Sequence, residues 1–345
     1  MREDGGGAVS GRAGGWLVCG VAGLELDADE RRLLAEVRPA GVVLFARNVD
    51  DPAQLASLVR ELRRLPSAPY AAIDLEGGRV NRLERLIGPL PASAAAARAG
   101  PRAVRALARA AASACAHFGV GVDLAPVVDI ARRGGFLAGE ARCFGASALK
   151  VHSAAATFLA GLEAYGVAGC LKHYPGLGSG EVDSHRDLPE LGEEVATDSQ
   201  VFHRLAGPGR AVMVAHALAP RLGEGALPAT LSRAVVGRLR SLAAPILADD
   251  LEMGALKAFG TIPQRAAAAL AAGCDQVLVC NALAVRQEVA EHVGAVADGD
   301  PSLAAALREG ERRVVPFGRA ELRPVGWDQV RRLADRARRL AGGVP

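Results

Sequence analysis

The amino-acid sequence predicts an α/β protein that folds as a single-domain (β/α)8 TIM barrel. Short apolar runs alternate along the 345 residues with longer Ala-, Leu- and Arg-rich segments of helical periodicity. The runs are apolar throughout, which is typical of parallel strands buried on both faces. About eight such units fit in the chain, and eight units of strand and helix close a barrel.

The expected strands and helices follow one another in a regular order. An open, doubly wound sheet is the alternative, but no Gly-x-Gly-x-x-Gly motif opens a helix after the first strand, which disfavours its dinucleotide-binding version. The strands are expected at residues 16–21, 41–45, 70–74, 120–124, 168–173, 211–216, 245–249 and 276–280. Amphipathic helices are expected between them at residues 29–37, 52–64, 101–118, 148–165, 231–242 and 262–272.

The two ends of the chain are expected to differ. Residues 1–15 are Gly-rich and are expected to be disordered, so the domain should span residues 16–345. The Arg-rich segment 282–345 has helical periodicity, with a turn region marked by Pro316 and Pro324. It is too short for a second domain, and we expect it to supply the closing helices of the barrel.

The composition argues against several classes of partner. The 41 basic and 38 acidic residues nearly balance and only 4% of residues are aromatic, which gives no basis for binding nucleic acid. No run is as long as a membrane span, and residues 16–21 are too short a run for a signal peptide. The six cysteines are scattered, so they are expected to be reduced thiols rather than disulfides or zinc ligands. We expect a soluble cytoplasmic protein with no metal, cofactor, nucleic acid or membrane partner.

The stretch 172–185 gives the strongest indication of chemistry. It follows an apolar run and places Lys172, His173, Asp183 and His185 on one Gly-rich loop. An Asp two positions before a His can orient the imidazole and balance its charge, which is one way to build a general acid/base. A purely structural role for all four is difficult to reconcile with such a loop.

Polar residues also follow most of the other expected strands, at the end where barrels of this kind hold their active sites. Charged groups at the ends of so many apolar runs are costly to bury without partners, so a shared polar pocket is expected. Taken singly, several have structural explanations: Asp123 and Asp129 as helix caps or turn residues, His216 as a core histidine, and Asp250 as a cap. The strand-end residues include Asp74, Glu76, Arg82, Asp123, Asp129, His216, Asp249, Asp250 and Asn281.

These residues carry a resemblance to glycoside hydrolase family 3, and specifically to its bacterial β-N-acetylglucosaminidase branch. Two of the matching motifs are Ile73-Asp-Leu-Glu-Gly-Gly-Arg-Val-Asn-Arg82 and Leu247-Ala-Asp-Asp-Leu-Glu-Met253. No single motif is decisive, but the segments occur in the family's order and together they are specific. They are residues 41–48, 73–82, 123–129, 142–145, 172–173 with 183–185, 214–216, 228–232, 247–253 and 272–281.

The resemblance implies a retaining exo-β-N-acetylglucosaminidase that acts on cell-wall muropeptides in peptidoglycan recycling, and we expect it to be a monomer. It implies Asp249 as the nucleophile and His185, oriented by Asp183, as the acid/base. A His–Asp pair can replace the usual carboxylic acid because imidazole titrates near neutral pH, and a mobile loop lets it approach and withdraw. The residues implied to hold the terminal sugar are Asp74, Arg82, Arg142, Lys172 and His173, with His216 in the floor of the site.

Two other functions fit the same fold. A phosphate anion meets less repulsion from a His than from a Glu, so a β-N-acetylglucosaminide phosphorylase is one alternative. A catalytically weak sugar-binding protein is the other, because the loop departs from the family pattern. Tyr174 stands where Phe is usual, and Leu177 stands where a second His is usual. Leu177 puts loop mobility or contacts with the aglycone in question, but no residue implied in the chemistry is changed.

Overall fold

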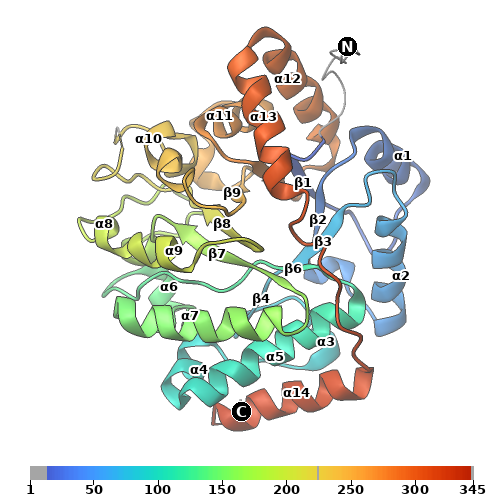
Figure 1. Ribbon diagram of the computed structural model, residues 1–345, viewed down its shortest axis with the longest axis vertical. Helices are drawn as coiled ribbons and strands as arrows, with labels where there is room; N and C mark the ends of the chain where they lie inside the picture. Colours follow the sequence, from blue (N-terminus) through green and yellow to red (C-terminus); the bar gives the residue numbers. More distant parts are fainter. Residues whose placement is uncertain (1–13, 224, 343–345) are drawn as a thin grey trace, which may run out of the picture.

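Eight parallel strands close into a barrel that is surrounded by helices, as the sequence predicts (Figure 1). The computed structural model describes residues 14–223 and 225–342. Every expected strand is present, with ends that differ from the prediction by a few residues. The strands are β1 (Leu17–Gly20), β2 (Gly41–Leu44), β3 (Tyr70–Ile73), β6 (Val122–Asp123), β7 (Ala168–Tyr174), β8 (Arg210–Val214), β9 (Ile246–Asp250) and β10 (Gln276–Val279).

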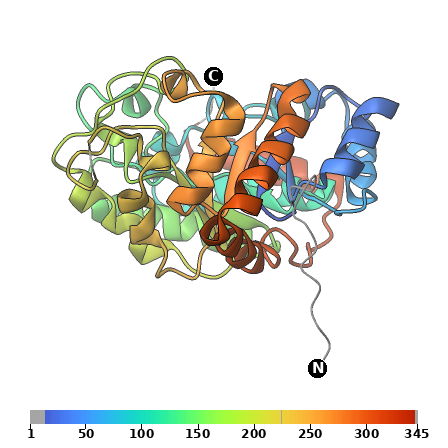
Figure 2. The ribbon, with the colours of Figure 1, turned by 90° about the horizontal axis from the view of Figure 1, so that it is seen from above.

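The barrel closes between its first and last strands. β1 pairs in parallel with β10, where Val18 lies opposite Leu278, and with β2, where Cys19 lies opposite Val42. Figure 2, seen from above, shows the orange C-terminal helices next to the blue N-terminal ones. Because all eight strands are parallel, their C-terminal ends form one mouth of the barrel and their N-terminal ends form the other.

Five of the six expected helices are present with closely matching bounds. Asp27, Asp51 and Thr261 cap three of them by accepting hydrogen bonds from backbone N–H groups of the first turn. No helix among the described residues is both long and apolar enough to cross a membrane. The five are α1 (Ala28–Val37), α2 (Pro52–Arg63), α5 (Pro101–Phe118), α7 (Ala148–Glu163) and α11 (Ile262–Ala272).

The continuous helix expected at residues 231–242 is wrong. The chain there forms a short helix, α10 (Arg233–Val236), followed by a 3-10 turn at Gly237–Leu239. Gly237 lies at the junction, and glycine is a poor helix former. The sequence also did not reveal several short elements: the hairpin β4 (Leu75–Gly77) with β5 (Val80–Asn81), and the helices α3 (Glu84–Ile87), α4 (Ser93–Ala99), α6 (Phe136–Gly139), α8 (Val195–Asp198) and α9 (Gln200–Leu205).

The C-terminal segment is helical, as its periodicity predicts. It forms α12 (Arg286–Gly299), α13 (Pro301–Val314) and, after the turn region around Pro316 and Pro324, α14 (Trp327–Leu340). α12 packs against α11, whereas α14 returns to lie along α5 (Figure 1). At the other terminus, residues 1–13 lie outside the described part of the chain. The disorder expected for them therefore stays a prediction. The carbonyl of Gly15 accepts a hydrogen bond from Gln276 (3.1 Å).

The barrel interior is packed at its N-terminal mouth. Phe317, from the turn after α13, lies edge-on against Tyr70 with 5.5 Å between ring centroids. The Tyr70 hydroxyl donates a hydrogen bond to the side chain of Gln276 (2.7 Å). Both side chains lie at the beginning of their strands, β3 and β10. This mouth is therefore closed, and the cavity described below lies at the opposite one.

Candidate active site

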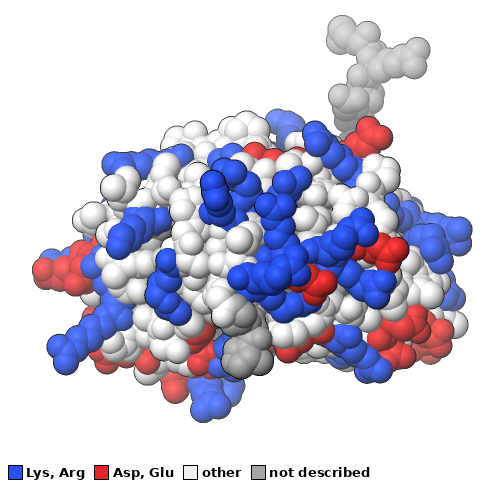
Figure 3. Space-filling model, turned by 90° about the horizontal axis from the view of Figure 1, so that it is seen from below, with Lys and Arg blue, Asp and Glu red and all other residues white. Residues whose placement is uncertain are grey.

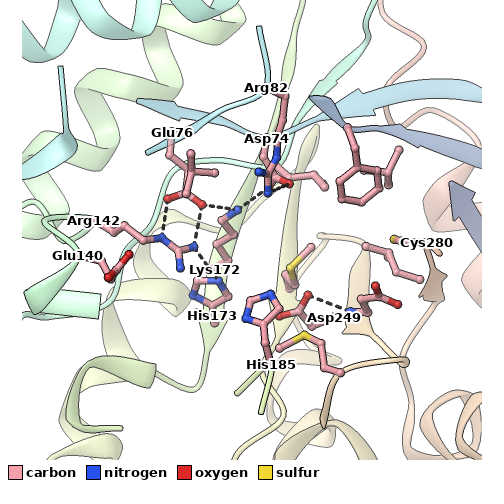
Figure 4. Close-up of a pocket in the computed structure, with 18 of the residues that line it drawn as sticks. Asp74, Glu76, Arg82, Glu140, Arg142, Lys172, His173, His185, Asp249 and Cys280 are labelled. Atoms are coloured by element: carbon pink, nitrogen blue, oxygen red, sulfur yellow. Dashed lines mark hydrogen bonds and ion pairs between the residues drawn. The ribbon is translucent and has the colours of Figure 1, made fainter. Parts of the chain in front are cut away.

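One cavity of about 300 Å³ lies at the C-terminal mouth of the barrel (Figure 4). It is lined by side chains from the ends of most of the strands and from the loops that follow them. Barrels of this kind hold their active sites at this mouth. Eight of the nine residues predicted to form the site line the cavity: Asp74, Arg82, Arg142, Lys172, His173, Asp183, His185 and Asp249.

A cluster of buried charges forms one wall of the cavity. Lys172 Nζ lies 2.7 Å from Asp74 Oδ1 and 2.6 Å from Glu76 Oε1. Arg142 donates two hydrogen bonds of 2.8 Å to the two oxygens of Glu76. This bidentate geometry is among the stronger kinds of ion pair. Figure 4 shows the four side chains joined in one network that faces the cavity.

The pairing keeps this cluster ionised. Burial raises the pKa of Glu76, but Lys172 and Arg142 outweigh it and hold that pKa well below its usual range. Burial lowers the pKa of Lys172, but Asp74 and Glu76 hold it above its usual range. The wall thus presents fixed donors and acceptors of opposite charge, which suits the recognition of hydroxyl groups.

Glu76 was expected at the shared polar pocket as one of the strand-end residues, but no individual role was assigned to it. The run Glu76-Gly77-Gly78 is also typical of a tight turn. The turn does exist, since Gly77 and Gly78 have φ angles of 92° and 58°. It belongs to the β4–β5 hairpin, which turns the Glu76 carboxylate inward. The charge of Lys172, on β7 and two strands from β3 in the barrel, was the available sign that a buried carboxylate was needed.

Arg82 and Asp74 form the rim of the same wall. Arg82 Nη2 lies 3.7 Å from Asp74 Oδ2, which is a longer contact than those of Lys172. The Arg82 guanidinium lies 5.8 Å from the centre of the Phe45 ring, which also lines the cavity. Asp74 Oδ2 is therefore only loosely paired within the cavity.

His173 is fixed by Asp129, a fully buried carboxylate. Asp129 Oδ2 accepts hydrogen bonds from the His173 ring (Nδ1, 2.8 Å) and from the His173 backbone N–H (3.1 Å). Its other oxygen accepts one from the backbone N–H of Leu177 (2.6 Å). Asp129 is thus neither a helix cap nor a simple turn residue. It orients the ring so that Nε2 faces the cavity, 3.5 Å from Arg142.

Leu177 is buried in the hydrophobic core and lies in a 3-10 turn, Leu177–Ser179. Its side chain is therefore part of the packed base of the loop. The exposed part of the loop begins after it, at Glu181. The departure from the family pattern at this position thus affects how the loop is anchored, and the residue does not line the cavity.

Asp183 and His185 extend from the arm beyond this base. Asp183 Oδ1 accepts hydrogen bonds from the His185 backbone (3.0 Å) and from Nδ1 of its ring (2.8 Å), which leaves Nε2 available. Partial burial raises the pKa of Asp183, but the two bonds from His185 outweigh it and hold the pKa below its usual value. The His185 side chain is 69% exposed, so this ring is the most accessible group of the site with acid/base capability.

The arm is attached to the loop that follows β9. The backbone N–H of Gly254 donates to the His185 carbonyl (3.0 Å), and that of Ala255 donates to the Ser184 carbonyl (3.2 Å). A side chain at position 254 would collide with the arm, because a Cβ there would lie 2.6 Å from the His185 carbonyl oxygen. These contacts hold the arm at the cavity, which the His185 ring lines together with Asp249 and the wall of charges (Figure 4).

Asp249 lies near the end of β9, inside the cavity. Its Oδ1 accepts a hydrogen bond from the backbone N–H of Asp250 (2.8 Å). Burial raises the pKa of Asp249, but the charges of His173 and His216 and this hydrogen bond together lower it below the usual value. The carboxylate is therefore ionised at neutral pH, and its second oxygen has no protein donor among the hydrogen bonds of the described residues.

His216 is the exception among the predicted site residues. It was expected in the floor of the site, but it is fully buried and does not line the cavity. Its ring lies between the Thr230 hydroxyl (2.7 Å) and the Asp250 carbonyl, to which Nε2 donates (2.9 Å). Burial lowers the pKa of His216 below its usual value. His216 is therefore better described as a core histidine. Its hydrogen bond to the Asp250 carbonyl holds the end of β9.

The remaining strand-end aspartates are also not helix caps. Asp123 Oδ1 accepts a hydrogen bond from the backbone of Leu75 (3.0 Å), and burial raises the pKa of Asp123 to about 8. Asp250 lines the cavity and accepts from the backbone of Glu252 (3.2 Å). Burial, followed by the charge of Glu252, raises the pKa of Asp250 to about 7. The mouth thus holds carboxylates of quite different acidity.

Comparison with known proteins decides the family. The glycosyl hydrolase family 3 N terminal domain matches residues 15–315. The chain belongs to glycoside hydrolase family 3. It is therefore a glycoside hydrolase, and the resemblance inferred from the ordered motifs is confirmed.

Relatives of this family 3 hydrolase match over most of their length. A beta-hexosaminidase of Thiobacillus denitrificans is 36% identical over 303 residues, which are 83% of this chain and 82% of the relative. A beta-hexosaminidase of Alkalilimnicola ehrlichii is 35% identical over 340 residues, or 92% and 95%.

Solved structures of family 3 proteins have the same fold. NagZ from Neisseria gonorrhoeae, solved in complex with N-trifluoroacetyl-D-glucosamine, superposes with a TM-score of 0.74 at 27% identity and covers 96% of this chain and 98% of its own. A β-N-acetylglucosaminidase from Paenibacillus sp. FPU-7 gives a TM-score of 0.83 at 28% identity, covering 95% of this chain and 68% of its own.

Proposed function

We propose that this family 3 hydrolase is a retaining exo-β-N-acetylglucosaminidase with Asp249 as its nucleophile and His185 as its acid/base. The observation that carries the proposal is that Asp249, the His185–Asp183 pair and the wall of charges all line one cavity. A retaining glycosidase needs a carboxylate to attack the anomeric carbon and a second group to protonate the leaving oxygen.

In the first step, an oxygen of Asp249 attacks the anomeric carbon while the bond to the leaving oxygen breaks. Nε2 of protonated His185 gives its proton to that oxygen, which leaves the neutral ring. Asp183 stabilises the imidazolium before the transfer and holds the ring by Nδ1. The sugar is then joined to Asp249 through an ester.

In the second step, neutral His185 takes a proton from a water molecule as the water oxygen attacks the anomeric carbon. The ester bond breaks, which returns Asp249 as a carboxylate and His185 as an imidazolium. Two displacements at the same carbon retain the β configuration. The exposed position of His185 on its arm suits a group that must serve both a departing aglycone and an entering water.

The wall of charges supports removal of a terminal sugar. Asp74, Arg82, Arg142, Lys172 and His173 close one side of a cavity of about 300 Å³, which leaves room for one sugar ring rather than for a continuing chain. The proposal that this ring is N-acetylglucosamine rests on the β-N-acetylglucosaminidase and NagZ structures with the same fold. Contacts to hydroxyl groups that strengthen as the ring becomes an oxocarbenium ion would lower the barrier itself.

We propose further that the natural substrates are muropeptides released from the cell wall, and that a monomer cleaves them in the cytoplasm during peptidoglycan recycling. The domain carrying this activity would span residues 16–345. Neither a metal ion nor a cofactor takes part in the proposed steps, since a carboxylate and an imidazole supply both displacement and proton transfer.

Kinetics with an aryl β-N-acetylglucosaminide test the proposal. Asp249→Ala should lose about four orders of magnitude in kcat, as expected when a nucleophile is removed. His185→Ala should lose about 100-fold with a poor leaving group and recover most of it with 2,4-dinitrophenol, which needs no protonation. Asp187→Asn is the matched control, because Asp187 is exposed on the same arm and has no side-chain partner among the hydrogen bonds of the described residues.

The same assay separates the alternatives. Rate enhancement by phosphate with release of a sugar 1-phosphate would identify a phosphorylase. Product binding without turnover would identify a sugar-binding protein. Undiminished turnover in Asp249→Ala would refute the assignment of the nucleophile. The decisive natural compound is a GlcNAc–anhydro-muramyl peptide, with its products identified in the presence and absence of phosphate.

A further inference from the structure

A groove lined by arginines lies between α5 and α14, on the outside of the barrel. Arg102, Arg105 and Arg109 of α5 face Arg336 of α14 across a hollow of about 160 Å³, with Leu333 beside it. All four arginines are exposed. Figure 3 shows basic side chains gathered on the face of the molecule where these two helices lie. None of these residues lines the cavity of the glycosidase site.

The positive charge of the groove is not balanced by neighbouring side chains. α5 contains no Asp or Glu in its 18 residues. The two aspartates of α14, Asp328 and Asp335, pair with other arginines of their own helix, Arg331 and Arg338. Across residues 14–223 and 225–342, no ion pair connects any of the four groove arginines to a carboxylate.

The position of these arginines on α5 adds a second unfavourable effect. Arg102 and Arg105 lie in its first two turns, at the positive end of the helix dipole, where cations are disfavoured and anions are favoured. The residue before the helix is Gly100, so no side chain caps the free N–H groups. Spacings of three and four residues also put Arg102, Arg105 and Arg109 on one face, where like charges repel. A bound anion would relieve the dipole and the repulsion together.

We propose that this groove is a binding site for a small ligand that carries two or more phosphate groups. Guanidinium groups bind phosphate oxygens in a bidentate manner, and the groove offers four of them. The helical rise places Arg109 about 10 Å beyond Arg102, so one phosphate reaches only part of the row, whereas a di- or triphosphate spans more of it.

The lining of the groove favours a small ligand over a macromolecule. The hollow is bounded by two helices, and its lining includes no aromatic side chain on which a base could stack. Its only larger apolar side chain, Leu333, is half-buried and is not available for insertion into a lipid layer. The ligand class therefore follows from charge and size. Binding there is independent of the proposed hydrolysis, because the two sites share no residue.

Calorimetric titration of the full chain with sodium tripolyphosphate, at constant ionic strength, tests the site. Wild type should bind one equivalent saturably, and excess ligand at about 100 times Kd should raise Tm by about 4 °C. The double variant Arg105→Ser with Arg109→Ser should bind at least ten-fold more weakly. The matched control is Arg308→Ser with Arg312→Ser on α13, which removes two exposed arginines at the same spacing and should bind within two-fold of wild type.

Three results would overturn the proposal. One is weak, unsaturable binding in all three proteins, which describes general charge attraction. Another is equal affinity in wild type and in the groove variant. The third is groove-dependent binding of phosphatidylglycerol vesicles or single-stranded DNA without binding of tripolyphosphate, which would assign the surface to a macromolecule. Glycosidase activity of the same proteins, measured separately, reports on the proposed function and does not enter this test.

Discussion

The two mouths of the barrel are made by the same eight strands, but their side chains serve different purposes. At the N-terminal mouth, Phe317 and Tyr70 pack together and close the interior. At the C-terminal mouth, Lys172 and Glu76 are buried as charges beside an open cavity, and Asp249 is partly buried in the same cavity. The first arrangement stabilises the fold. The second is unfavourable in folding free energy, because charge is buried, but it keeps reactive groups in place.

Buried charge occurs at both mouths, and its pairing distinguishes them. Asp275, at the beginning of β10, accepts hydrogen bonds from the Ile246 backbone (2.9 Å) and from Arg240 (3.0 Å) and Arg313 (2.9 Å). Its carboxylate is enclosed by protein donors and ties α13 to the barrel. Asp249 has a single protein hydrogen bond in the described structure and an oxygen facing the cavity. A carboxylate inside the cavity with few protein partners is thus the feature that distinguishes the C-terminal mouth.

The largest expected effect is at the C-terminal mouth. Asp249→Asn should lower kcat by about 10⁴-fold, equivalent to about 5 kcal/mol of activation free energy, because the amide is not a nucleophile. Tm should stay within about 2 °C of wild type, since the hydrogen bond from the Asp250 backbone can be kept. Steady-state kinetics and thermal melts on one preparation measure both. A large decrease in Tm, with a loss of activity that is explained by unfolding, would mean that Asp249 has a structural role.

The converse is expected at the N-terminal mouth. Phe317→Ala should reduce the free energy of unfolding by about 4 kcal/mol, because it leaves a cavity against Tyr70 in a packed interior. The kcat/KM of the protein that remains folded should lie within two-fold of wild type. Urea unfolding and kinetics at a temperature well below Tm are the measurements. A strong effect on kcat at that temperature would show that the two mouths are coupled.

Asp129 is expected to be a positioning residue of intermediate weight. Asp129→Asn replaces an acceptor by a donor opposite the N–H groups of His173 or Leu177, so the ring and the base of the arm cannot both be held. We expect kcat/KM to fall about 50-fold, with KM raised through His173 and kcat lowered through the arm. Amide exchange of the peptide containing Leu177 should also quicken. If Asp129→Asn kept the KM and kcat of wild type, Asp129 would have no positioning role in the site.

The smallest expected effect is a gain in stability at the C-terminal mouth. Burial raises the pKa of Asp123 to about 8, above the value of about 3.9 of an unfolded chain. Between these values the folded state binds more protons than the unfolded state, so this group's contribution to stability falls as pH rises. Asp123→Asn removes the dependence and should stabilise by about 2 kcal/mol at pH 8 but little at pH 4.

Urea unfolding of both proteins at the two pH values measures this gain. The Leu75 N–H can still donate to the amide oxygen of the variant, so the hydrogen bond itself is not at issue. A difference in stability that does not change with pH would contradict the raised pKa. A decrease in the free energy of unfolding at both pH values would mean that Asp123 stabilises the fold, as Phe317 and Tyr70 do at the opposite mouth.

The fold could be predicted because its signals are local. Fully apolar runs identify buried parallel strands, and Asp27, Asp51 and Thr261 mark helix starts through their own side-chain bonds. The prediction failed at residues 231–242. The helical periodicity of the sequence continues through Gly237, but the α-helix ends at Val236 and a 3-10 turn follows. The β4–β5 hairpin was missed for a similar reason, since two short strands around a Gly-Gly turn cannot be distinguished from a turn alone.

The site could be predicted in part because parallel strands bring their C-terminal ends together. This geometry gathers Asp74, Lys172 and Asp249 from separate parts of the chain. It does not say which way a side chain near a strand end points. His216 faces Thr230 behind the sheet, and only three-dimensional packing reveals this. The groove of α5 and α14 was equally hidden, because its arginines are 227 residues apart in sequence at their closest and meet only when α14 returns to α5.

The most direct test of the functional mouth is to trap the enzyme during turnover. The protein is incubated with a 5-fluoro derivative of β-N-acetylglucosaminyl fluoride, which slows breakdown of a covalent intermediate, and is then digested and analysed by mass spectrometry. We expect one added sugar, on Asp249, in the peptide that contains residues 246–253. A sugar on another carboxylate such as Asp250 or Glu252, or turnover without any covalent adduct, would contradict it.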